Sequence, residues 1–155
     1  MKKYIFISII IFYTSCTKVE DHSDNTSFFE GIQSDKITFI IDLSINENST
    51  EDLDNFISEI TQNVLDKEDF CLEYAYYLSE DKINVTLYEK YIDSKGALQH
   101  GQNFMESPYF ERFFNLFSIE KFVVTGPASD EFKKFASDNE FEIEYQNLIH
   151  GFKRK

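Results

Sequence analysis

The alternation of apolar and polar residues predicts five β-strands in this chain. Successive side chains of a strand point to opposite faces, so apolar residues two positions apart share one face. Glu89 stands out in this pattern, because it falls on the apolar face of its strand between Leu87 and Tyr91. The predicted strands are residues 36–45, 71–78, 83–92, 121–125 and 141–149.

Apolar residues spaced three and four positions apart predict helices between these strands. The first helix begins after a capping residue within 48–50 and extends to about Leu65. The second begins near Ser94, after Asp93, and carries Gly101 in its interior, which weakens a helix by about 1 kcal/mol relative to Ala.

Two shorter helices follow in the second half of the chain. Pro108 suits the first turn of one of them, and Ser129 suits the cap of the other. The first of these helices carries an aromatic stripe at helical spacing, for which core packing is the expected role. The stripe consists of Phe110, Phe113, Phe114 and Phe117.

The first residues have the features of an export signal. Two lysines precede residues 4–13, which are apolar or nearly so, and Thr14-Ser15-Cys16 follows. Ten residues at about 1.5 Å each are too short for a hydrocarbon layer of about 30 Å, so a secretory signal fits better than a transmembrane helix. Small residues before a cysteine resemble a bacterial lipoprotein processing site. Plain secretion is one alternative, and a cytosolic protein with an unusual apolar start is the other.

We therefore expect a membrane-anchored lipoprotein of the bacterial cell envelope, facing the periplasm or the cell surface. Cys16 is the predicted lipidation site. The predicted organisation is a signal peptide at 1–15, a lipid-anchored flexible linker at 16–35 and one folded domain at 36–155.

The charge balance excludes one class of partner. The formal net charge is −13, and loss of residues 1–15 would remove two lysines and no acid, giving −15. Such a surface repels phosphate backbones, so no nucleic-acid partner is expected.

Once Cys16 is acylated, Cys71 has no partner for an intrachain disulfide, and acidic neighbours make it a poor nucleophile.

The order of the elements indicates an α+β fold. A β-α-β unit followed by a second β-α-β unit is the ferredoxin-like split arrangement, an antiparallel sheet covered by helices on one face. The last helix and strand extend it. Apolar residues occur on both sides of the first three strands, so the uncovered face is expected to meet the sheet of a second copy in a homodimer.

The segment from Leu72 to Phe104 resembles the antibiotic biosynthesis monooxygenase family of dimeric α/β barrels. The order of elements agrees from Lys36 to about Thr125, and the trailing helix and strand resemble an extension found in some members. The similarity rests on the order and spacing of Glu89, Tyr91, Asp93, Ala97, His100 and Phe104.

This resemblance implies a dimer with face-to-face sheets and a pocket in each subunit between sheet and helices. Well-studied members oxygenate phenols or quinols without a metal or an organic cofactor, and distant relatives degrade haem. Many members have no known activity, so the fold alone does not establish an enzyme. The chain contains no Trp, which some active relatives use in the pocket, and this departure argues most strongly against haem degradation.

His100 and Glu89 are the candidate catalytic residues. The reference pKa of histidine, about 6.5, suits proton transfer near neutral pH, and Glu89 can orient or stabilise the imidazole. In the alternative reading, the two residues form a structural pair and the tyrosines belong to the core. The predicted substrate-binding residues are Tyr74, Tyr76, Tyr91, Asn103 and Phe104.

The sequence leaves two main functional hypotheses and a third, weaker one. One is a membrane-tethered, cofactor-independent monooxygenase-like protein acting on a small aromatic or quinol-type compound. The other is a non-catalytic envelope module of the same fold that binds a small molecule or another lipoprotein, and haem binding is a third, weaker option. No metal site is predicted, because His22, His100 and His150 are far apart and no His-x-x-x-His or Cys-x-x-Cys motif exists.

Overall fold

The computed structural model of the chain describes residues 35–151. The predicted signal peptide, Cys16 and nearly all of the predicted linker lie outside the described residues, so those assignments stay predictions. Within the described part, no helix combines the length and the apolar character needed to cross a membrane.

The described residues form a five-stranded sheet and four helices. The sheet order is β2-β3-β1-β4-β5; the first four strands pair antiparallel, and β5 pairs parallel to β4. This is the predicted ferredoxin-like split arrangement, with one strand added at its edge. The elements are β1 Ile37–Ile45, α2 Leu53–Lys67, β2 Cys71–Leu78, β3 Asn84–Tyr91, α3 Ser94–Glu106, α4 Tyr109–Leu116, β4 Phe117–Thr125, α5 Asp130–Asp138 and β5 Glu144–Gln146.

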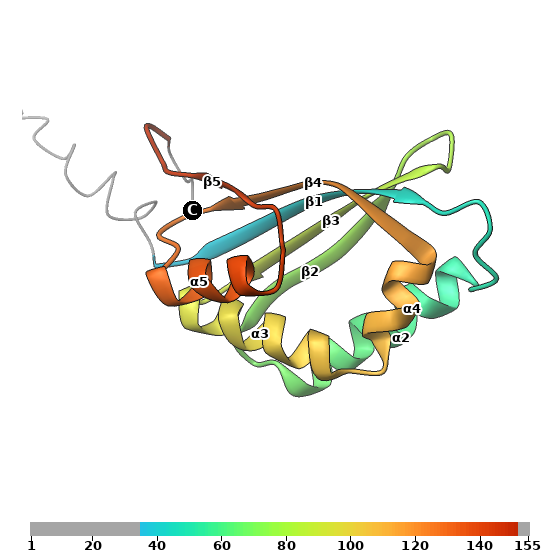
Figure 1. Cartoon of the computed structure of the whole chain (residues 1–155), viewed down its shortest axis with the longest axis horizontal. Helices are drawn as coiled ribbons and strands as arrows, with labels where there is room; N and C mark the ends of the chain where they lie inside the picture. The colour runs from blue at the N-terminus through green and yellow to red at the C-terminus, as the bar shows by residue number, and fades with distance from the viewer. Residues whose placement is uncertain (1–34, 152–155) are drawn as a thin grey trace, which may run out of the picture.

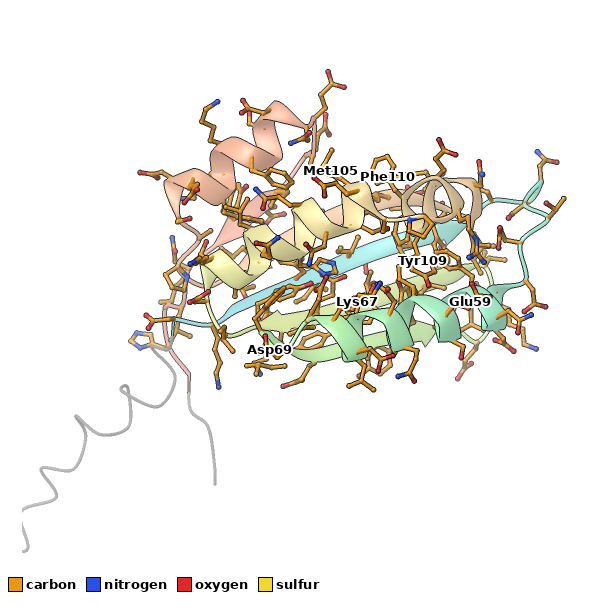
Figure 2. All side chains as sticks on the ribbon, turned by 90° about the horizontal axis from the view of Figure 1, so that it is seen from below. Glu59, Lys67, Asp69, Met105, Tyr109 and Phe110 are labelled. Atoms are coloured by element: carbon orange, nitrogen blue, oxygen red, sulfur yellow. The ribbon has the colours of Figure 1, made fainter. Side chains whose placement is uncertain are left out.

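All four helices lie on the same face of the sheet (Figure 1). The helical side of the molecule shows α3 between α5 and α2 (Figure 2). The strands bury the residues that alternate toward this face, as the sequence pattern predicts. Phe39 lies opposite Glu89 of β3 and Val124 of β4, and all three side chains are buried.

The other face of the sheet is not covered by any helix within residues 35–151. Ala75, Tyr88, Ile40 and Val123 are neighbours in a row across four strands of this face. The predicted homodimer would cover that row, and the described chain leaves this prediction open.

Side-chain caps set the start of three helices. Asp93 Oδ1 accepts a hydrogen bond from the Gly96 amide at 2.8 Å, and Ser129 Oγ accepts one from the Phe132 amide at 3.2 Å, as expected from the sequence. The first helix starts later than predicted, because Asp52, rather than a residue in 48–50, accepts from the Asn55 amide. A carboxylate at this end also interacts favourably with the helix dipole.

Two strand predictions differ from the structure. β4 begins at Phe117 rather than at residue 121, because Phe117 pairs with Ile45 of β1 and so leaves the helical stripe predicted for it. β5 covers only residues 144–146, which pair with 123–125 of β4. The remaining residues of the strand predicted at 141–149 have no partner strand, and Ile149 is 83% exposed.

Candidate functional site

A small apolar cavity lies between the sheet and the helices. Its volume is about 60 Å³, and eight phenylalanine side chains contribute to its walls. Residues from β1, β2, β3, β4, α3, α4 and α5 line it. Its polar side chains are Tyr74, Glu89 and His100, so any polar recognition in this cavity involves those three groups.

His100 is held by an acid that the sequence analysis did not single out. His100 Nδ1 lies 2.7 Å from Glu68 Oε2, and Asn103 Nδ2 donates to Glu68 Oε1 at 2.9 Å. Residues 100 and 103 share a face of α3 because they are three positions apart. Glu68 follows the last residue of α2, between Lys67 and Asp69, which Figure 2 labels. One buried carboxylate thus attaches α3 to the end of α2.

Glu89 lies on the other side of the imidazole. His100 Nε2 is 3.7 Å from Glu89 Oε1, which is beyond hydrogen-bond distance. The Tyr91 hydroxyl donates to Glu89 Oε2 at 2.7 Å, since residues 89 and 91 point to the same face of β3. Within residues 35–151, every fully enclosed side-chain nitrogen or oxygen has a hydrogen-bond partner. Because Nε2 has no such partner, it is not fully enclosed. His100 lines the cavity.

Two tyrosines of β2 complete the polar end. Tyr74 lies opposite Glu89 in the sheet, and its ring centroid is 5.9 Å from that of His100. The hydroxyl groups of Tyr74 and Tyr76 are 3.1 Å apart and share a hydrogen bond. Tyr74 lines the cavity directly, and Tyr76 supports it from the next position on the same face of β2.

The three central ionisable groups are nearly inaccessible, with exposed fractions of 4% for Glu68, 3% for Glu89 and 7% for His100. Burial acts to raise the pKa of Glu68, but the hydrogen bond and charge of His100 and the hydrogen bond from Asn103 outweigh it and lower that pKa. Burial acts to lower the pKa of His100, but the charge of Glu89 and the hydrogen bond and charge of Glu68 raise it.

The pKa of Glu89 is raised, because burial outweighs the charge of His100 and the hydrogen bond from Tyr91. Burial and neighbouring groups also raise the pKa values of Tyr74 and Tyr91 well above the ordinary value, so both phenols stay protonated. The site therefore contains one carboxylate that remains ionised, one imidazole that protonates readily, and one carboxyl group that retains its proton longer than an exposed glutamate.

The structure brings the predicted site residues together, in two groups. His100, Glu89, Tyr74 and Phe104 line the cavity. The other three do not line the cavity but form hydrogen bonds near it. Tyr91 is hydrogen-bonded to Glu89, Asn103 to Glu68, and Tyr76 to Tyr74. The catalytic and substrate-binding roles assigned to these seven residues stay predictions.

Glu68 is the functional candidate that the sequence reasoning missed. One local signal was present: a glutamate at the C-terminal end of a helix is unfavourable with the helix dipole, so it requires a compensating partner. Which partner compensates it depends on the packing of α2 against α3.

Burial raises the pKa of nearby Cys71 to about 12, reinforced by the charges of Glu89 and Glu68, so this thiol is not a nucleophile at neutral pH.

Residues 35–151 contain no group of three or more histidine, cysteine, aspartate or glutamate side chains arranged to hold a metal ion. Within this range, the histidines are His100 and His150, and His22 lies outside it.

No protein-family model and no curated protein matches the chain. Solved structures do match. MupZ from Pseudomonas fluorescens is 24% identical, with 77% of this chain and 94% of that chain covered and a TM-score of 0.63. A conserved protein from Bacteroides thetaiotaomicron, described as a possible oxidoreductase, is 19% identical, with coverage of 59% and 96% and a TM-score of 0.50.

The structural neighbours also include a protein from Chloroflexus aurantiacus named for the antibiotic biosynthesis monooxygenases. It is 11% identical, with 61% of this chain and 94% of that chain covered and a TM-score of 0.44. At such identities, the likeness of the first two structures shows the ferredoxin-like fold, and function has to be argued from the site.

Proposed function

We propose that the chain is a cofactor-independent monooxygenase-like protein that acts on a small phenol or quinol-type compound. The observation that supports this proposal best is the position of His100. The imidazole lines an apolar cavity, while its Nδ1 atom is hydrogen-bonded to the buried Glu68 carboxylate at 2.7 Å, which leaves Nε2 for the substrate. A base with a fixed orientation in a dry cavity is what removal of a phenolic proton requires.

Glu68 fixes the tautomer of His100. The lowered pKa of Glu68 keeps it ionised, so Nδ1 carries the proton that it shares with Glu68. In the neutral form of His100, Nε2 then has a free lone pair, and the raised pKa of this residue makes it a stronger base. When Nε2 takes a proton from the substrate, the Glu68 carboxylate stabilises the imidazolium that forms.

Glu89 faces the oxygen atom that becomes negative. Nε2 and Glu89 Oε1 are 3.7 Å apart, so one substrate oxygen between them lies within hydrogen-bond distance of both. Because burial raises the pKa of Glu89, this carboxyl group takes up a proton more easily than an exposed glutamate, and in its protonated form it can donate a hydrogen bond to the developing phenolate. The aromatic walls exclude water and leave the anion exposed to dissolved oxygen.

The proposed reaction balances without a further reductant. A phenol with a free ring position loses its hydroxyl proton to Nε2 and its ring electrons to dioxygen. One oxygen atom forms a new carbonyl on the ring, which becomes a quinone. The other oxygen atom leaves as water, with the hydroxyl hydrogen and the ring hydrogen of the substrate.

Oxygen uptake and isotope incorporation test this proposal. A panel of substituted phenols and quinols is incubated with the protein under ¹⁸O₂, and the product is analysed by mass spectrometry. The wild type should introduce one labelled oxygen atom, and His100→Gln should lower the rate by about 100-fold or more. Equal rates for the two proteins would remove His100 as the base and contradict the mechanism.

One observation supports the alternative function, a non-catalytic module that binds a small molecule. Glu68 accepts a hydrogen bond from Asn103 and Glu89 accepts one from Tyr91, so both buried acids are satisfied without a reacting substrate. A protein of this fold that binds a ligand without converting it would show saturable binding in calorimetry and no oxygen uptake. That combination would favour the alternative over the enzyme.

The proposal also includes the location and assembly of the protein. We place it in the bacterial cell envelope, tethered by a lipid on Cys16 and assembled as a homodimer through the uncovered sheet face. The small residues before Cys16 and the partly exposed row at Ala75, Tyr88 and Ile40 support these two points. Mass spectrometry of the membrane fraction tests the first: Cys16→Ala should abolish the acyl modification.

A further inference from the structure

The cavity is too small for the aromatic compound that the proposed function assigns to it. A dry cavity that accepts benzene in another protein measures about 150 Å³, whereas the space beside His100 measures about 60 Å³. At least one wall side chain must therefore move, or be smaller, before a ring can place its hydroxyl group at Nε2. The question is which side chain controls that space.

Phe135 of α5 closes the cavity directly beside the catalytic candidate. Gly101, the residue after His100, also lines the cavity, and α3 and α5 are in contact. A Cβ atom at position 101 would lie 2.7 Å from Phe135 Cε1. The Phe135 ring therefore occupies the space that any other residue at 101 would fill. The glycine inside α3 is explained by this contact, which offsets its low helix propensity.

The two phenylalanines of α5 differ in how firmly they are held. Phe132 is 3% exposed and stacks on Phe39 of β1 with 5.5 Å between ring centroids. Phe135, three positions later, is only partly buried. Phe132 thus anchors α5 to the sheet, while Phe135 can leave the cavity without breaking that anchor.

We infer that Phe135, seated on Gly101, sets the size of the hydroxyarene that the cavity accepts. This inference rests on the proposed function, because it assumes that the ligand directs a hydroxyl group toward Nε2 of His100. Truncation of Phe135 removes one aromatic ring from the wall and leaves the volume of one further ring in the cavity. The wild type therefore admits a ring only when Phe135 moves aside, whereas Phe135→Ala has that space open and tolerates a second fused ring better than the wild type does.

Calorimetric titration of the full chain with phenol and with 2-naphthol tests this inference. Phe135→Ala should bind 2-naphthol at least about tenfold more tightly than the wild type does, because even one extra methylene group in a hydrophobic pocket changes the affinity by about 10- to 200-fold. Circular dichroism and thermal unfolding establish that each variant is folded.

Phe110→Ala is the matched control. Phe110 belongs to the same aromatic cluster, with 5.4 Å between its ring centroid and that of Phe104, and it is not part of the cavity wall. It lies near Met105 where α3 gives way to α4 (Figure 2). Its truncation should leave the ratio of the 2-naphthol and phenol affinities unchanged.

The outcomes separate this inference from the function on which it rests. If phenol binds, His100→Gln weakens that binding, and Phe135→Ala leaves the affinity ratio unchanged, the size rule is wrong and the proposed function stands. An equal change of the ratio in Phe135→Ala and Phe110→Ala also overturns the size rule. If no variant binds either compound, both proposals are overturned.

Discussion

Glu68 is a buried acid at the least favourable end of a helix. The C-terminal end of α2 carries the negative pole of the helix dipole, and Glu68 is 4% exposed there. Two donors from α3, His100 Nδ1 and Asn103 Nδ2, offset this cost. Because Glu68 does not line the cavity, in the proposed mechanism it acts through His100, as a positioning residue rather than a catalytic one.

Replacement of Glu68 by glutamine should lower the pKa of His100. The Glu68 carboxylate contributes both a hydrogen bond and a negative charge that raise this pKa, so their loss favours the neutral imidazole at lower pH. Titration of the His100 ring signals by NMR measures the effect without a substrate, and comparison with His100→Gln assigns the signals. In an active protein, the rising limb of the pH–rate profile should move toward acid by the same amount.

The chain provides a control for this titration. Glu73 pairs with Lys90 at 2.9 Å on the surface and does not contact His100, so Glu73→Gln should leave the pKa of His100 unchanged. A His100 midpoint that stays the same in Glu68→Gln would show that the short contact to Nδ1 does not govern the proton on this ring.

At the level of elements, the segment between β4 and α5 decides where the cavity is closed. Gly126 ends β4 with a φ of +106°, and a Cβ atom there would collide with the backbone oxygen of Lys36. Only glycine adopts this conformation without strain. The resulting turn leads α5 onto the helical face of the sheet, where Phe132 and Phe135 complete the cavity wall.

Gly126→Ala should lower the free energy of unfolding by about 2 kcal/mol, because it combines a strained backbone with a steric collision. Urea unfolding measures the loss. Lys82, in the turn between β2 and β3, is a control of opposite sign: its φ is +61°, so Lys82→Gly should not destabilise the protein through backbone strain. Equal stability of Gly126→Ala and the wild type would contradict this account of the turn.

For the whole molecule, the main asymmetry is between the two faces of the sheet. The helices cover one face, and the row of Ala75, Tyr88, Ile40 and Val123 lies on the other. An apolar row of this kind, spread over four strands, is suited to burial against a second sheet. A homodimer of the size typical for stable interfaces buries about 1,200 Å² or more in total.

Ile40→Asp should therefore convert the proposed dimer to a folded monomer. The substitution places a charge at the centre of the proposed interface, where it would be buried without a partner. Light scattering coupled to size-exclusion chromatography measures the mass, and circular dichroism verifies the fold. Leu65→Asp is the control, because Leu65 is 74% exposed on α2 at the helical side. A monomeric wild type at micromolar concentration would contradict the proposed assembly.

The order of strands and helices could be predicted from the sequence alone, because it depends on local periodicity and capping. The alternation around Glu89, the cap at Asp93 and the spacing of His100 on its helix are properties of neighbouring residues. These are sufficient to place an acid and an imidazole between the same two layers. The lipid anchor and the dimer concern surfaces and segments that no contact within residues 35–151 tests.

Only the tertiary structure decided which groups meet. Glu68 contacts His100 across 32 positions of sequence, and Phe135 meets Gly101 from another helix, so no local pattern encodes either pair. Phe117 likewise leaves its helical stripe because pairing with Ile45 in the sheet outweighs its spacing. Periodicity specifies which face of an element is buried, whereas the contact between two faces depends on how complete elements pack.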